Sequence, residues 1–151
     1  LLKRAAHPRP LVVSIDQEGG RVARLRGRPW APLPAMRVLG EASDAESRVR
    51  ALPALLAREL RAVGIDLDFA PVLDVDTNPA NPVIGDRSFS RDPAVVARIG
   101  AIFVAELQRG GVAAVEVPEL RPLQRQGVAR VLHEHGVPQA QPHGEAAVGQ
   151  P

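Results

Sequence analysis

Charged side chains and a glycine pair are concentrated in residues 16–24, directly after a short run of β-branched residues. The polar groups of this segment come from Asp16, Gln17, Glu18, Arg21 and Arg24. Ligands of parallel α/β folds bind beyond the carboxyl ends of the strands, so Asp16 is placed to meet a polar ligand. Gly19 and Gly20 let the backbone turn close beside it. A glycine turn with solvated charges would explain the glycines, but not this density of carboxylate, amide and guanidinium groups.

A second polar group lies in residues 78–90, inside a long loop that follows the next apolar segment. A loop of this length in a compact domain is usually functional or disordered, and its apolar residues favour one that packs. Arg87 is then held in place. Two interpretations stay open: Arg87 contacts the same ligand as the first segment, or it pins the loop by pairing with Asp86 or Asp92.

An alternative function is metal-dependent phosphotransfer, which is suggested by four aspartates in the middle of the chain. They are Asp66, Asp68, Asp74 and Asp76. A two-metal phosphotransfer site would need such carboxylates gathered at strand ends, together with a divalent ion. Asp66 and Asp68 fall on one side of a strand near its start, away from the edge where ligands bind. We therefore interpret them as mostly structural.

Alternating strands and helices are predicted to position these groups. Strands are expected at residues 11–15, at 65–69 continuing into 72–75, and from Val112. Helices are expected at residues 45–63, with Pro53 delaying or kinking the start, and from Asp92–Pro93 to Gly110. Gly64 is expected just beyond the end of the first helix. This order indicates an α/β protein, either a doubly wound sheet or a (β/α)8 barrel.

Composition and charge argue against several classes of protein. The 151-residue chain is 45% hydrophobic and lacks cysteine, which is typical of a globular domain without disulfides. Its net charge is only +2, aromatic residues are 3%, and the arginines are scattered, so no nucleic acid partner is expected. No apolar run reaches the roughly 18 residues of a membrane span. The first residues lack the apolar core of a signal peptide, but the chain does not begin with Met, so this says little about the compartment. The compartment is left unknown, with a cytoplasmic location favoured. Nothing in the sequence indicates an oligomeric state.

Residues 115–151 differ from the rest, because prolines interrupt them and their apolar periodicity is weak. We expect residues 1–114 to form the domain and 115–151 to be a divergent, mostly irregular tail, disordered or frameshifted. His133, His135 and His143 suggest a metal site, but histidines at i and i+2 do not share a helical face. We expect no metal and no cofactor.

Three motifs, in order along the chain, closely resemble glycoside hydrolase family 3, in its β-N-acetylglucosaminidase branch of peptidoglycan-recycling enzymes. They occupy residues 15–24, 64–75, and 84–89 followed by Asp92–Pro93. The resemblance covers about residues 1–114. It implies a partial (β/α)8 TIM barrel of about three βα units, since a whole barrel takes about 250 residues.

The resemblance further implies that Asp16, Arg24 and Arg87 bind the sugar. A carboxylate can accept hydrogen bonds from two vicinal hydroxyls, and arginines on the same face can donate to other sugar oxygens. The family's enzymes are retaining and use an aspartate nucleophile, with a histidine as acid/base in this branch. The implied function is a glycoside hydrolase that releases terminal β-linked N-acetylglucosamine from peptidoglycan-type saccharides in a full-length parent.

The catalytic residues of the family are missing from this sequence. After Ala114 the family continues with a Lys-His-Phe-Pro-Gly-His-Gly motif, then the loop with the catalytic histidine and, much later, the nucleophile; none of them occurs here. We therefore interpret the chain as an inactive fragment without catalytic residues of its own, so its standing as an enzyme stays open. A non-catalytic sugar-binding or scaffold remnant, or a β-glucosidase of the same family, are the alternatives.

Overall fold

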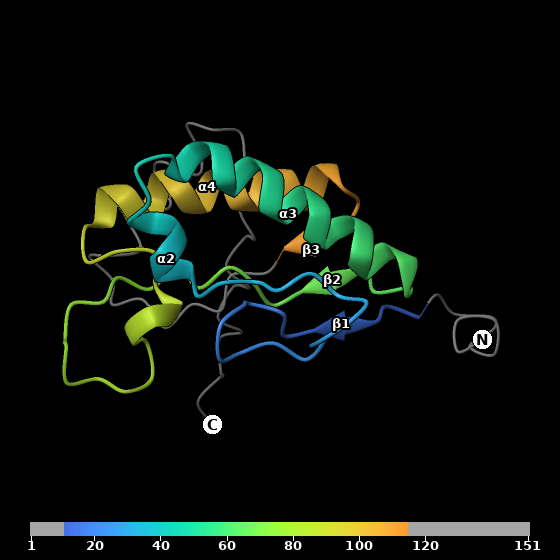
Figure 1. Ribbon diagram of the computed structural model, residues 1–151, viewed down its shortest axis with the longest axis horizontal. Helices are drawn as coiled ribbons and strands as arrows, with labels where there is room; N and C mark the ends of the chain where they lie inside the picture. Colours follow the sequence, from blue (N-terminus) through green and yellow to red (C-terminus); the bar gives the residue numbers. More distant parts are fainter. Residues whose placement is uncertain (1–10, 115–151) are drawn as a thin grey trace, which may run out of the picture.

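A computed structural model describes residues 11–114, which form a parallel sheet with helices packed on it (Figure 1). In chain order the elements are strand β1 (Ser14–Ile15), helices α2 (Met36–Gly40) and α3 (Ala45–Ala62), strand β2 (Leu67–Asp68), the 3-10 turn η1 (Gly85–Arg87), helix α4 (Pro93–Arg109) and strand β3 (Ala113–Ala114). The prediction of an α/β fold with a parallel sheet is confirmed.

The sheet has the strand order β1-β2-β3, and both pairings are parallel. Ser14 pairs with Leu67, and Leu67 pairs with Ala113, so all three strands end at the same edge. The strands are shorter than predicted, and residues 72–75 are not part of one. Pro71 has no backbone N–H to donate to a neighbouring strand, which is consistent with the end of the sheet before it.

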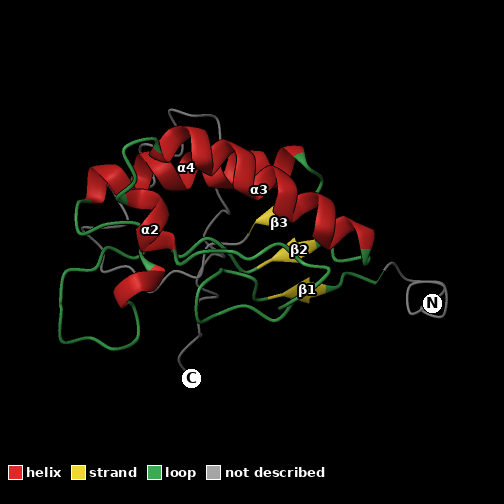
Figure 2. Ribbon diagram, viewed as in Figure 1, coloured by secondary structure: helices red, strands yellow, loops and turns green. Residues whose placement is uncertain are grey.

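Helices α3 and α4 pack against each other and cover one face of the sheet (Figure 2). Their buried side chains form most of the core, and the largest are Leu56, Leu60, Ile99, Phe103 and Leu107. Helix α3 begins at Ala45 and runs through Pro53, so the predicted delay of its start is wrong. The predicted caps are confirmed: Gly64 has φ 82°, and the Asp92 carboxylate accepts from the Ala94 N–H at 2.8 Å.

Helix α2 and turn η1 were not predicted from the sequence. Both affect how the long loop packs on the domain. Phe89, in the loop just after η1, is fully buried, with its ring centroid 6.0 Å from that of Phe103 on α4. At the end of α2, a Cβ added to Gly40 would lie 1.9 Å from the Phe89 carbonyl oxygen, so only glycine allows this close approach. The loop therefore packs on the domain, as predicted.

Among residues 11–114, no helix combines the length and the apolar character needed to cross a membrane.

Candidate functional site

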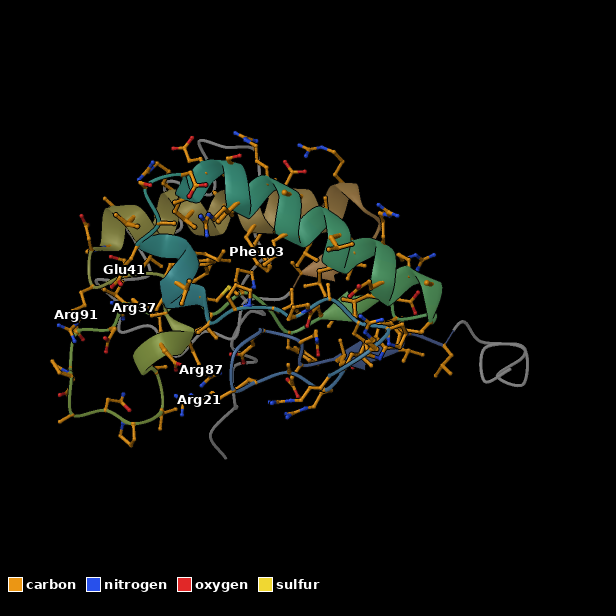
Figure 3. The ribbon with its side chains drawn as sticks, in the orientation of Figure 1. Arg21, Arg37, Glu41, Arg87, Arg91 and Phe103 are labelled. Carbon is orange, nitrogen blue, oxygen red and sulfur yellow. The ribbon has the colours of Figure 1, made fainter. Side chains whose placement is uncertain are left out.

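Two loops meet at the carboxyl edge of the sheet: the first loop (residues 16–25), after β1, and the second loop (residues 76–91), which contains η1. Arg87 of the second loop forms a bidentate ion pair with Glu18 of the first, with its Nε and Nη2 each 2.7 Å from a carboxylate oxygen. Arg21 of the first loop pairs with Asp86 of the second at 3.2 Å. Its Nη2 also donates to the carbonyl oxygens of Pro82, Val83 and Ile84. We call these two crossed pairs the arginine clasp (Figure 3).

The structure pairs Arg87 with a carboxylate that was not among the partners predicted from the sequence. Asp86 pairs with Arg21, and Asp92 caps helix α4. The carboxylate that holds Arg87 is Glu18, which lies 69 positions away in the sequence, and its side chain is only 6% exposed. Such a pairing depends on how the two loops pack, so no local pattern could have revealed it.

Asp16 and Arg24 form a second ion pair on the first loop, with Nη2 and Oδ2 3.2 Å apart. Asp16 directly follows β1, and its side chain is 49% exposed, while that of Arg24 is 58% exposed. Glu18 is two residues further along the same segment, and it holds Arg87. The three residues predicted to bind sugar are therefore all at the carboxyl edge of the sheet, with Asp16 and Arg24 open to solvent.

Gln17 organises the first loop from inside, and its role was not predicted. The residue is 2% exposed, and its Oε1 accepts from the backbone N–H groups of Arg24 at 2.6 Å and Leu25 at 3.0 Å. Its Nε2 donates to the Leu25 carbonyl at 3.0 Å. Since a buried amide with both ends paired is fixed in orientation, Gln17 sets the position of the Arg24 backbone.

Asp68 lies at the ligand-binding edge of the sheet and contacts the first loop. The prediction that Asp68 lies away from this edge is therefore wrong. Strand β2 ends at Asp68, so its side chain sits at the carboxyl edge, and its Oδ1 accepts from the Gln17 N–H at 2.9 Å. Its Oδ2 is buried and has no hydrogen-bond partner among the described residues. Burial raises the pKa of Asp68 to about 7; the Gln17 hydrogen bond lowers it, while the charges of Asp16 and Glu18 raise it.

The other aspartates considered for a metal site have structural contacts. Asp66 accepts from the Val13 N–H at 3.0 Å and from Arg61 at 2.9 Å, which confirms its structural interpretation. Asp76 lies between two arginines, described below. Within residues 11–114, no three His, Cys, Asp or Glu side chains are grouped so that they could hold a metal ion. The histidines at 133, 135 and 143 lie outside the described residues.

A cavity of about 440 Å³ lies between helix α2 and the second loop. It is lined by Arg37, Glu41, Asp76, Pro79, Gly85, Asp86, Ser90 and Arg91. The Asp76 carboxylate, 5% exposed, accepts from Arg37 at 2.7 Å and from Arg91 at 3.3 Å. Arg37 also donates to the Gly85 carbonyl at 3.1 Å, so it ties α2 to η1.

Comparison with known proteins decides the family. The profile of the glycosyl hydrolase family 3 N-terminal domain matches residues 2–116, which is most of the chain. The chain belongs to glycosyl hydrolase family 3. A beta-hexosaminidase of Nitrosomonas eutropha is 39% identical over 144 residues, and the match covers 92% of this chain and 37% of that protein.

Solved structures of family 3 proteins are also similar to this chain. A family member from Mycobacterium smegmatis matches with a TM-score of 0.70 and 39% identity, covering 76% of this chain and 34% of the other. NagZ from Neisseria gonorrhoeae, solved in complex with N-trifluoroacetyl-D-glucosamine, matches with a TM-score of 0.66 and 42% identity, covering 77% and 35%. The predicted resemblance is confirmed, and the chain spans about a third of the length of these relatives.

Proposed function

We propose that this chain supplies part of the sugar-binding site of a family 3 β-N-acetylhexosaminidase, and that Asp16, Arg24 and Arg87 contact a terminal β-linked N-acetylglucosamine. In this proposal residues 1–114 are about three βα units of a (β/α)8 barrel. The parent enzyme releases the terminal sugar from peptidoglycan-type saccharides by a retaining mechanism. By itself the chain binds sugar and does not hydrolyse it, since it lacks the family's nucleophile and acid/base.

The arginine clasp is the observation that carries this proposal. It joins the loop after β1 to the loop after β2, so residues from distant parts of the sequence can act on one ligand. The nearly buried Glu18 carboxylate fixes the plane of the Arg87 guanidinium through two hydrogen bonds. A guanidinium held in this way is pre-organised, which reduces the entropy lost on binding.

Asp16 and Arg24 have the chemistry that a sugar ring requires. The Asp16 carboxylate can accept hydrogen bonds from two vicinal hydroxyls, and the Arg24 guanidinium can donate to a ring substituent. Their mutual ion pair is half exposed, so a ligand can enter it at small electrostatic cost. The neighbour that binds an N-acyl glucosamine, NagZ, supports the choice of N-acetylglucosamine.

Saturation-transfer NMR on the full chain tests the proposal, with N-acetylglucosamine and glucose as the two probes. We expect binding of N-acetylglucosamine and about tenfold or greater loss in Asp16→Asn, because hydrogen bonds to a charged group contribute about 1.5–3 kcal/mol. Asp44→Asn is the matched control, since Asp44 is as exposed and is also paired with an arginine. Absence of binding in the wild type would contradict the proposal, and a preference for glucose would favour a β-glucosidase.

Turnover is tested separately with an aryl N-acetyl-β-glucosaminide. We expect no release of the aryl group above the uncatalysed rate, because loss of the nucleophile and acid/base removes most of the rate enhancement. Steady turnover that is lost in Asp16→Asn would show instead that the chain is itself an enzyme.

A further inference from the structure

The Asp68 carboxyl group extends the contact between strands β1 and β2 into the first loop. Ile15 is in register with Asp68, and the Phe69 N–H donates to the Ile15 carbonyl at 2.9 Å. Two residues beyond Ile15, the Gln17 N–H donates to Oδ1 of the Asp68 side chain, also at 2.9 Å. A buried side chain therefore guides the backbone after the last paired residue of β1.

These two hydrogen bonds together fix the direction of the Asp16 side chain. The Ile15 carbonyl belongs to the peptide group before Asp16, and the Gln17 N–H belongs to the peptide group after it. Each peptide group is planar, so a hydrogen bond to one of its atoms restrains the whole group. With both groups held from the end of β2, the Cα–Cβ bond of Asp16 has one orientation.

The contact of Asp68 with Gln17 also reaches Arg24. The Gln17 side chain is buried, and its Oε1 accepts from the Arg24 N–H at 2.6 Å. Arg24 in turn pairs with Asp16 through its guanidinium. Both members of this exposed ion pair therefore depend on the position of Gln17, which Asp68 holds from behind.

The burial of Asp68 is unfavourable for the fold. The residue is 0% exposed, and its Oδ2 is buried without a hydrogen-bond partner among the described residues. A buried polar atom that lacks a partner lowers the free energy of unfolding. Groups that cost stability in this way are often found where they serve a binding or catalytic site.

We propose that Asp68 is a positioning residue of the sugar site: it fixes the peptide group between Asp16 and Gln17 and, through the Gln17 amide, the Arg24 backbone. Asp16 and Arg24 then face the same sugar ring. Asp68 does this as a neutral acid, with its proton on Oδ2 and with Oδ1 free to accept from Gln17. The inference rests on the proposed function, since it concerns the same site.

The charges near Asp68 favour its neutral form when sugar is bound. In the described part of the chain, burial raises the pKa of Asp68, and the charges of Asp16 and Glu18 raise it further. Arg24 and Arg87 are the partners of these two acids. A sugar that covers Asp16 displaces water, which strengthens the repulsion between Asp16 and an ionised Asp68. Sugar should therefore bind more weakly at a pH above about 7, where Asp68 is ionised.

The test is an NMR titration of the full chain with N-acetylglucosamine at pH 6 and pH 8.5. We expect the dissociation constant of the wild type to rise about fivefold between the two, which is a weak coupling between two groups. Asp68→Asn keeps an acceptor for the Gln17 N–H without a charge, so it should bind equally at both pH values and as tightly as the wild type at pH 6. Asp68→Ala removes the acceptor and should bind about tenfold more weakly at pH 6. Asp44→Asn, which removes an exposed carboxylate at the start of α3, is the control and should keep the wild-type pH dependence.

The outcomes separate this inference from the proposed function. If the wild type binds sugar but Asp68→Ala, folded by circular dichroism, binds as tightly, Asp68 does not position the site. A wild-type affinity that is the same at both pH values, or a pH dependence that persists in Asp68→Asn, would also overturn the inference. If Asp68→Ala does not fold, the comparison of the wild type with Asp68→Asn decides. If the wild type binds no sugar at either pH, the proposed function fails and this inference fails with it.

Discussion

Asp68→Asn is predicted to make the stability of the chain less dependent on pH. In the folded protein, burial raises the pKa of Asp68 from its ordinary value of 3.8 to about 7. The folded state therefore holds this proton over a pH range in which the unfolded chain has released it. Asp68 makes its full contribution to the free energy of unfolding below pH 3.8, where its side chain is protonated in both states. This contribution is lost as the pH rises to about 7.

The size of the effect follows from the two pKa values. Each pH unit between them corresponds to about 1.4 kcal/mol. Ionised Asp68 should therefore lower the free energy of unfolding by about 4 kcal/mol above pH 7, relative to the protonated side chain. Asparagine has the same shape and can still accept from the Gln17 N–H, but it carries no charge. Its unpartnered amide N–H groups cost about 1–3 kcal/mol at every pH, so this cost cancels when two pH values are compared.

Urea denaturation at pH 4 and pH 8, followed by circular dichroism, measures this difference. We expect the stability of Asp68→Asn relative to the wild type to rise by about 3–4 kcal/mol from the lower to the higher pH. Asp44→Asn, which removes an exposed carboxylate at the start of α3, controls for the loss of one negative charge. If the difference in unfolding free energy between Asp68→Asn and the wild type is the same at both pH values, the pKa of Asp68 is not raised by the fold.

Two further substitutions test how the second loop is held. Glu18→Gln should destabilise the fold by about 2 kcal/mol in urea denaturation, because it weakens a nearly buried bidentate pair. Glu46→Gln weakens an exposed ion pair with Arg98 and should lower the free energy of unfolding by less than about 1 kcal/mol. Equal losses of stability in Glu18→Gln and Glu46→Gln would contradict the idea that the arginine clasp stabilises the second loop. Gly40→Ala should cost about 1–3 kcal/mol, since its Cβ would meet the Phe89 carbonyl at 1.9 Å, and an unchanged denaturation midpoint would exclude that close approach.

The helices were predictable because their signals are local. Leucines at steps of about one helical turn marked α3, and Asp92 with Pro93 marked the first turn of α4. Helix α2 has five residues, which is too short for a periodic pattern to appear. Each observed strand lies within a predicted one, but the predicted strands were too long. The alternation of apolar residues does not show where hydrogen bonding to the neighbouring strand ends.

The location of the site was predictable in part, because it follows from the order of the parallel strands. Parallel strands end at one edge, so the residues that follow β1 and β2 were expected to meet there. The choice of Glu18 as the partner of Arg87 depends on the packing of two loops. The position of Asp68 was misjudged because the end of β2 was set too far along the chain, and so its contact with Gln17 could not be foreseen.

An NMR titration of the arginine side-chain Nε–H groups with N-acetylglucosamine shows directly whether Arg24 and Arg87 bind the sugar. We expect the signals of Arg24 and Arg87 to shift together along one binding curve. Arg48 and Arg98, which pair with acids on the helices, should not shift. Saturable shifts confined to other arginines, or a ligand that leaves Arg24 and Arg87 unchanged while it binds, would contradict the assignment of the sugar site.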